Sequence, residues 1–261
     1  MIKLNPFNIL RKPQKLASES SNAPEYLSAP IFRTQSNLKL LNPLPVKLKT
    51  DTATVQVGNA MDSYSQFATY VNKKKYTEMG RHTFDIENNI LDGIEMDTWD
   101  KFQGNGIGEI MRLVSVIETA ENNLKGISAI SLSRAVPFHF KYFFRPDFSN
   151  SINSAAISQQ GNIEKILTQI ANNEHSESCT KEKAQILHKF MQNSGLNPEF
   201  VQKFDEFLTG YIKENLHRWD KTGFFPENKL TVPMSLKSET IRQNAGFFNE
   251  LFKKHGIDYT I

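Results

Sequence analysis

Three glycines, Gly104, Gly106 and Gly108, lie in the stretch FQGNGIGEIMRL, between a strand-like segment and a run with helical periodicity. Glycine adopts φ > 0 readily and lets the main chain come close to a ligand. The first turn of a helix presents N–H groups that have no partner inside the helix, and these favour an anion. The pattern therefore predicts a strand, a loop and a helix in succession, with a phosphate-bearing ligand held at the loop.

Four segments before the loop are rich in β-branched and aromatic residues and are separated by turn-forming residues, which is typical of antiparallel strands. They are TATVQVG, YSQFATYVN, EMGRHTFDIEN and ILDGIEMDT. The basic run NKKKY, residues 72–76, is predicted to form a solvated hairpin tip.

After the loop, apolar residues recur at helical spacing from Ile107 to Leu124. GISAISLS then has the length and apolar character of a strand, and RAVPFHFKYFF is predicted to be a short helix with Pro137 in its first turn. The order strand, glycine loop, helix, strand predicts a βαβ crossover in a mixed sheet.

Beyond Pro146, three segments have apolar residues spaced by three and four, so three helices are predicted, over residues 162–175, 181–192 and 198–216. The stripe Phe200, Phe204, Phe207, Leu208 and Tyr211 is interpreted as core, with a partner-binding groove as the alternative. NKLTVPMSL returns to strand character, and Ser238 is expected to N-cap a last helix that ends near Gly256.

These patterns divide the chain into four parts. Residues 1–48 are predicted to be a flexible arm, because they hold more than half of the eleven prolines and no sustained apolar period. Residues 49–150 form the strand-rich core, 151–220 a helical insert, and 221–261 the final strand and helix.

Charge and cysteine content exclude several function classes. The chain has 31 basic and 28 acidic residues, a balance that does not favour nucleic acid binding. Its single cysteine, Cys179, rules out an internal disulfide, and no apolar run approaches the length of about 18 residues needed to span a membrane. A cytoplasmic protein without a membrane partner is predicted, and its oligomeric state stays open.

Two common phosphate-binding loops do not match the glycine stretch. In the dinucleotide pattern G-x-G-x-x-G, the third glycine position is Glu109 when counted from Gly104, and Met111 when counted from Gly106. The P-loop pattern with its Gly-Lys-Ser/Thr ending does not occur in the chain.

The remaining pattern, Gln103-x-x-Gly106-x-Gly108, resembles the Q/R-x-x-G-x-G/A signature of the GNAT superfamily of acetyl-CoA-dependent N-acyltransferases. Downstream, AVPFHFKYFF resembles the A-x-x-F-Y-x-K-x-G-F segment of the same family. The matching residues there are Ala135, Phe138, Lys141 and Phe144. Over about residues 51–146, the resemblance implies an α/β fold with a GNAT-like mixed, mostly antiparallel sheet flanked by helices. It also implies acetyl transfer from acetyl-CoA to a primary amine.

The resemblance also implies site residues. Those expected to hold the coenzyme A diphosphate are Gln103, Gly104, Asn105, Gly106, Ile107 and Gly108. Met96, Asp97 and Thr98, on the strand before the loop, are the candidates for the pantetheine contact, and a connector two residues longer than usual leaves open which of them makes it.

Proton transfer needs two further groups. Glu95 is the first candidate for the base that takes the amine proton, and Asp97 the second, because strand alternation places both on one face. His139 stands where the family often has a tyrosine that protonates the leaving thiolate. A histidine with its ordinary pKa of about 6.5 can donate that proton. Phe143 replaces the family's glycine.

Other interpretations stay open. One is a coenzyme A-binding or protein-interaction module that has the loop but no catalytic activity. Another is a helical scaffold protein in which the glycines only form a turn. The acceptor is a small-molecule or protein amine, and the helical insert is a candidate for choosing it. His175, Cys179 and His188 match no zinc-site spacing, so no metal is predicted, and Cys179 is interpreted as a bystander thiol.

Overall fold

The computed structural model of the chain describes residues 45–47, 49, 52–59, 66–72, 77–149, 156–219 and 230–261. Most of the predicted arm, and residues 73–76 of the predicted hairpin tip, lie outside the described residues. Contacts divide the chain into a first unit, Met1–Ser128 with Lys237–Ile261, and a second unit, Ala129–Leu236.

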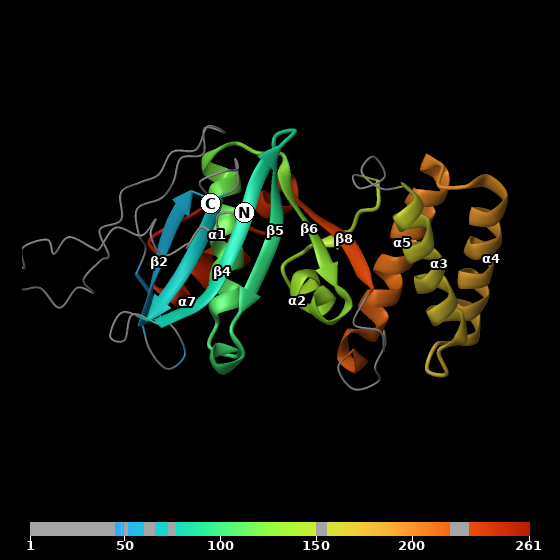
Figure 1. The fold of residues 1–261 in the computed structure, drawn as a ribbon, viewed down its shortest axis with the longest axis horizontal. Coiled ribbons are helices and arrows are strands. Elements are labelled where there is room, and N and C mark those ends of the chain that lie inside the picture. The colour runs from blue at the N-terminus through green and yellow to red at the C-terminus, as the bar shows by residue number, and fades with distance from the viewer. Residues whose placement is uncertain are drawn as a thin grey trace, which may run out of the picture. The chain divides into compact units, whose positions relative to one another are not determined.

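The first unit contains an antiparallel sheet in which strands that follow one another along the chain are paired (Figure 1). Its antiparallel strands are β1 (Pro45–Lys47), β2 (Thr52–Asn59), β3 (Gln66–Asn72), β4 (Thr77–Glu87) and β5 (Ile90–Thr98). The start of β6 (Gly126–Leu132) lies beside β5 in the same sheet. The four strands predicted before the loop are confirmed. β1 was not predicted, because its three residues lie in the proline-rich segment that was expected to be flexible.

Helix α1 (Ile107–Glu121) follows the glycine loop and packs against β4 and β5 of the first unit. It also contacts the C-terminal helices α6 (Ser238–Gln243) and α7 (Ala245–His255). Because it is covered by the sheet and by these helices, charged residues on it are buried as well as apolar ones, including Arg112 and Glu118.

The C-terminal segment differs from the single predicted helix. It breaks at Asn244, whose side chain donates to the Thr240 carbonyl at 2.8 Å and so competes with the helical hydrogen bonds. The prediction that Ser238 is the N-cap was wrong. Lys237, with an extended backbone, takes that position, and Ser238 is already the first helical residue. The prediction that the last helix ends near Gly256 is confirmed, and Gly256 is its C-cap with φ of 68°.

The second unit contains the rest of β6, a short strand β7 (Arg145–Pro146) and β8 (Thr231–Lys237), in the order β6-β8-β7. β7 and β8 are antiparallel, and β7 was not predicted. The helices are α2 (Val136–Lys141), α3 (Ala156–Asn172), α4 (Ser178–Ser194) and α5 (Pro198–Asn215). The predicted short helix and the three predicted helices of the insert are therefore confirmed.

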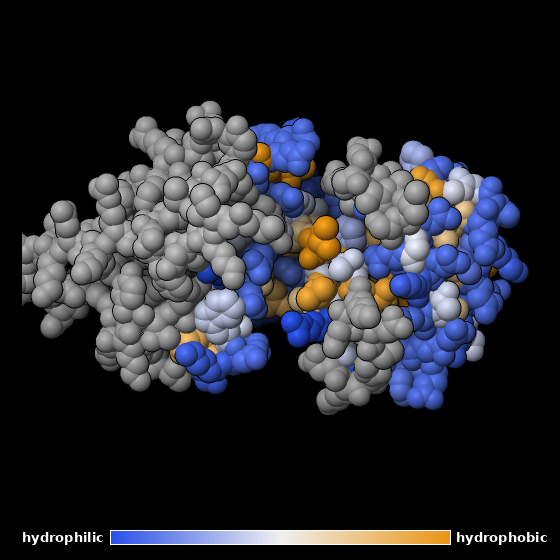
Figure 2. Space-filling view, in the orientation of Figure 1, coloured by the Kyte–Doolittle hydropathy of each residue, from blue (hydrophilic) through white to orange (hydrophobic). Residues whose placement is uncertain are grey.

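The predicted aromatic stripe of α5 forms core. Phe200, Phe204 and Leu208 are fully buried and Tyr211 nearly so, whereas Phe207 is only half-buried. Asn197 N-caps this helix by accepting from the Phe200 amide at 2.8 Å. The surface over α3, α4 and α5 is largely hydrophilic (Figure 2), as expected for helices whose apolar sides face inward. The predicted fold class, a mixed, mostly antiparallel sheet flanked by helices with a helical subdomain, is confirmed.

Candidate functional site

Strand β5 has a bulge immediately before Glu95. Glu95 lies opposite Thr83 on β4, whereas the next pair along the ladder is Gly93 with Phe84. Residue 94 is therefore an extra residue on β5 that has no partner residue on β4. Such bulges bend a strand and re-aim its side chains, and they are enriched beside active sites.

Beyond the bulge, the side chains of β5 alternate as predicted. Glu95 and Asp97 are exposed, while Met96 is half-buried on the other face. Met96 lies opposite His82, and the Arg112 Nη2 atom is 3.9 Å from its sulfur. Burial, with the charge of Arg112 second, lowers the pKa of His82 to about 3, so this histidine is neutral at ordinary pH. Sequence reasoning did not identify the buried His82 and Arg112 behind the strand.

The longer connector between β5 and the glycine loop forms a turn of 3-10 helix, η2 (Asp100–Phe102). It is followed by Gln103, whose side-chain nitrogen donates to Asp100 Oδ1 at 2.9 Å and to the Thr98 carbonyl at 3.4 Å. Gln103 thus ties the loop to the end of the strand. The Thr98 carbonyl is partly engaged by this contact, which leaves Met96 and Asp97 as the better candidates for a main-chain contact to a ligand.

The glycine loop has the backbone conformation that its sequence predicts. Gly104 and Gly106 have φ of 78° and 86°, in the left-handed region that favours glycine, and Gly106 is the N-cap of α1. Within the described part of the chain, the amides of Gly104, Gly106, Ile107 and Gly108 donate to no main-chain carbonyl. Asn105 is turned back on the loop, with both its amide and its side chain donating to the Phe102 carbonyl.

An ionic cluster lies at the start of α1, in which Glu109 and His255 are buried and Lys254 is exposed. Glu109, in the first turn, accepts from Lys254 and lies 2.6 Å from His255 Nε2. The other ring nitrogen of His255 lies 2.9 Å from the Lys47 carbonyl oxygen. Because a carbonyl oxygen only accepts, Nδ1 carries a proton, and the short contact to the Glu109 carboxylate holds one more.

This cluster matters for an anion at the loop. A lone carboxylate in the first turn of α1 would repel a phosphate at the same helix end. Lys254 and the contact with His255 offset the charge of Glu109, so the loop keeps its attraction for an anion. Sequence reasoning missed this arrangement because Glu109 and His255 are separated by 146 residues.

His139 belongs to the second unit, whereas Glu95 and the loop belong to the first. It lies on α2, is 6% exposed, and packs between the rings of Phe138 and Phe144 at centroid distances of 5.4 and 5.5 Å. Its main-chain carbonyl accepts from the amides of Tyr142 and Phe144.

The following turn explains one departure from the family motif. Phe143 has φ of 65°, the left-handed conformation that favours glycine, and the motif has glycine at this position. The backbone at Phe143 is therefore one that glycine would adopt without strain.

The other candidate groups are not assembled into a site. His188 is 3.3 Å from Glu164, and Cys179 is exposed beside Glu177. In the described ranges, no three histidine, cysteine, aspartate or glutamate side chains are grouped so as to hold a metal ion. None of the described helices has the length and apolar character to cross a bilayer.

Several solved structures match part of this chain. An acetyltransferase of the GNAT family from Staphylococcus aureus Mu50 matches at 19% identity over 37% of this chain and 62% of its own, with a TM-score of 0.31. Tetrahymena GCN5 matches at 12% identity over 36% and 61%, with a TM-score of 0.32. A GNAT family acetyltransferase from Elizabethkingia anophelis with acetyl-CoA bound matches at 11% identity over 34% and 63%, with a TM-score of 0.28. The chain thus spans about three fifths of the length of these proteins. No protein-family model and no curated protein matches its sequence.

Proposed function

We propose that the glycine loop binds the diphosphate of acetyl-CoA and that the protein transfers the acetyl group to a primary amine. The observation that carries the proposal is the set of amides at Gly104, Gly106, Ile107 and Gly108, which use no described main-chain acceptor and lie at the N-terminus of a 15-residue helix. A diphosphate needs such convergent N–H donors, and the helix dipole adds partial positive charge.

The residues around the loop fit this ligand. Gly108 carries no side chain in the first helical turn, so phosphate oxygens can approach the main chain closely. Because the contacts with Lys254 and His255 offset the charge of Glu109, this carboxylate repels a bound diphosphate less. We place the pantetheine arm along β5 at Met96 and Asp97, since the Thr98 carbonyl is held by Gln103.

The chemistry is direct attack of an amine on a thioester. Glu95 takes a proton from the acceptor ammonium, and the free amine nitrogen then forms a bond to the acetyl carbonyl carbon. The carbon–sulfur bond breaks, and the thiolate that leaves takes up the second proton of the attacking nitrogen. A main-chain N–H of β5 stabilises the charge on the thioester oxygen. The products are an acetamide and free coenzyme A.

The test is calorimetric titration with acetyl-CoA, followed by an assay of thiol release with a panel of amines. Glu95→Gln should lower kcat by about 100-fold or more while leaving coenzyme A affinity unchanged. Glu87→Gln, which changes an exposed carboxylate at the end of β4 with no proposed role, is the matched control and should lower kcat by less than about threefold. Equal losses in both variants would remove Glu95 as the base.

The second candidate is a coenzyme A-binding module without catalysis, and it is favoured by the environment of His139. This side chain is buried against two aromatic rings, where a general acid needs access to the leaving group. Binding of acetyl-CoA without thiol release for any amine would support the module. Failure of a folded protein to bind coenzyme A would contradict both candidates and leave the glycine loop as a structural turn.

A further inference from the structure

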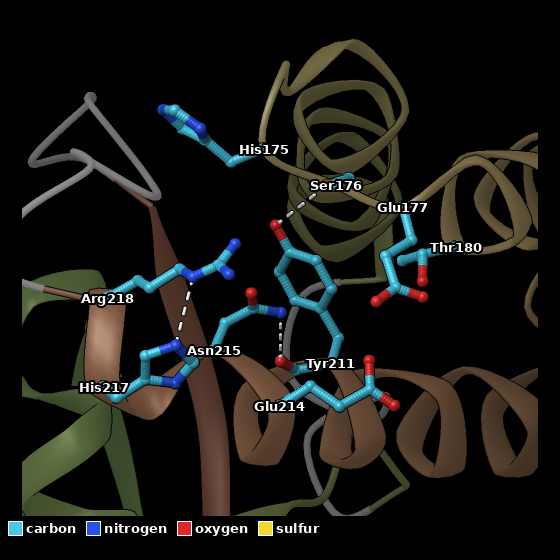
Figure 3. A pocket seen from close by; sticks show the side chains of 9 residues that line it. All are labelled: His175, Ser176, Glu177, Thr180, Tyr211, Glu214, Asn215, His217 and Arg218. Atoms are coloured by element: carbon cyan, nitrogen blue, oxygen red, sulfur yellow. Dashed lines mark hydrogen bonds between the residues drawn. The ribbon is translucent and has the colours of Figure 1, made fainter.

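The helices of the second unit line an open cavity of about 260 Å³ that contains neither Glu95 nor His139 (Figure 3). Its charged lining residues are exposed to solvent. It is formed by the turn between α3 and α4, the first turn of α4, and the end of α5 with the short η4 helix (Leu216–Arg218). The residues that line it are His175, Ser176, Glu177, Thr180, Tyr211, Glu214, Asn215, His217 and Arg218. None is aliphatic, so the cavity suits a small polar ligand rather than an apolar one.

The buried part of the lining offers uncharged hydrogen-bonding groups. The Tyr211 hydroxyl lies 3.5 Å from Ser176 Oγ and 3.4 Å from Asn173 Nδ2, and burial raises its pKa to about 12, so it remains a neutral hydroxyl. Asn215 uses its side-chain nitrogen to donate to the Tyr211 carbonyl at 2.8 Å. The group that Asn215 offers to the cavity is therefore its amide oxygen.

One side of the cavity is cationic. Arg218, which is exposed, donates from Nε to His217 Nε2 at 3.0 Å, and this contact orients its guanidinium. Figure 3 shows the terminal nitrogens of Arg218 directed toward the centre of the cavity, with His175 and His217 on the same side. A planar guanidinium held in this way is suited to a carboxylate.

The other side carries two carboxylates, from Glu177 and Glu214, and Figure 3 shows them across the cavity from the cationic side. Only two acidic side chains line the cavity, and no cluster of three metal-ligand residues exists in the described part of the chain. An ammonium group, with its three N–H donors, fits two carboxylates and an amide oxygen.

We propose that this cavity binds a small zwitterion of the free amino acid class. The carboxylate of the ligand is held by Arg218 and its ammonium by Glu177 and Glu214, while the Tyr211 hydroxyl and the Asn215 oxygen complete its hydrogen bonds. A ligand of this kind matches both charge sides at once, whereas a simple anion or a simple amine would face one side of like charge. The proposal does not depend on acetyl transfer, since every lining residue lies in the second unit.

The experiment is a thermal-shift screen of the full chain with the twenty free proteinogenic amino acids, followed by calorimetric titration of those that raise Tm. At least one amino acid should raise Tm, and its methyl ester and its N-acetyl derivative should each bind at least about tenfold more weakly, because each lacks one charge. The proposal is overturned if no amino acid binds, or if either derivative binds as tightly as the free amino acid.

Variants locate the site. Arg218→Gln and Glu214→Gln should each weaken binding by about tenfold or more. Lys213→Gln and Glu206→Gln, exposed positions on α5 that do not line the cavity, should change it by less than about twofold. Circular dichroism and a coenzyme A titration on the same samples report whether each variant is folded. Equal loss in the cavity variants and the controls would contradict the location.

Discussion

The substitution Gly106→Ala tests the geometry of the loop most sharply. Gly106 has φ of 86°, and a Cβ atom placed there would lie 3.1 Å from His255 Cε1. Gly104 has φ of 78°, and a Cβ atom placed there would meet no atom within 4 Å. Gly104→Ala is therefore a matched control, because it introduces only the strain of an alanine in the left-handed region and no new side-chain contact.

The magnitudes follow from these contacts. An alanine in the left-handed region costs about 1 to 2 kcal/mol, and this is the expected loss for Gly104→Ala. In Gly106→Ala, His255 must also move, which weakens its bonds to Glu109 and to the Lys47 carbonyl at a further cost of about 1 to 3 kcal/mol. The expected total for Gly106→Ala is therefore about 2 to 5 kcal/mol.

The assay is urea unfolding followed by tryptophan fluorescence. The chain has two tryptophans, so a Trp219→Phe background leaves Trp99, beside the loop, as the only reporter. Gly106→Ala should shift the midpoint to lower urea than Gly104→Ala. Adding His255→Ala should bring the two glycine variants to equal losses. If both glycine variants lose the same stability with His255 present, the packing of His255 against the loop is not as described.

Three further predictions concern stability. Phe143→Gly should be about 1 to 2 kcal/mol more stable than Phe143→Ala in urea unfolding, because both lose the ring and only alanine is strained at φ of 65°. Burial raises the pKa of Asp205 to about 7, so its protonated form stabilises the folded state below about pH 4 and this stabilisation is lost as the pH rises through about 7. Asp205→Asn keeps an acceptor for the Phe148 amide, and its free energy of unfolding should exceed that of the parent by about 2 to 4 kcal/mol at about pH 8. The two free energies should be equal near pH 4. A difference that does not change with pH would exclude this titration. Burial lowers the pKa of His82 to about 3, so the stability that its neutral form gives above about pH 6.5 is lost as the pH falls through about 3. In His82→Phe, the free energy of unfolding should therefore fall less steeply with decreasing pH. An unchanged slope on the acid side would contradict this.

Local patterns were sufficient for much of this fold. The spacing of Ile107, Ile110 and Met111 identified α1, and the glycines identified the left-handed turns that begin it. These features depend on residues within a few positions of one another, where periodicity and conformational preference are informative.

The features that the sequence did not indicate depend on long-range pairing. β7 consists of Arg145 and Pro146, too short for a periodic signal, and forms only because β8 lies beside it. The bulge before Glu95 appears only in the register between two strands. The pairing of Glu109 with His255 brings together side chains that no local pattern connects.

The most direct measurement is the amide chemical shift of the loop residues in an ¹⁵N-labelled sample titrated with coenzyme A. The account predicts that the amide resonances of Gly104, Gly106, Ile107 and Gly108 shift together with coenzyme A and stay unchanged with pantetheine, which has no diphosphate. If coenzyme A binds and these resonances remain in place, or if pantetheine moves them equally, the main-chain amides of this loop do not hold the diphosphate.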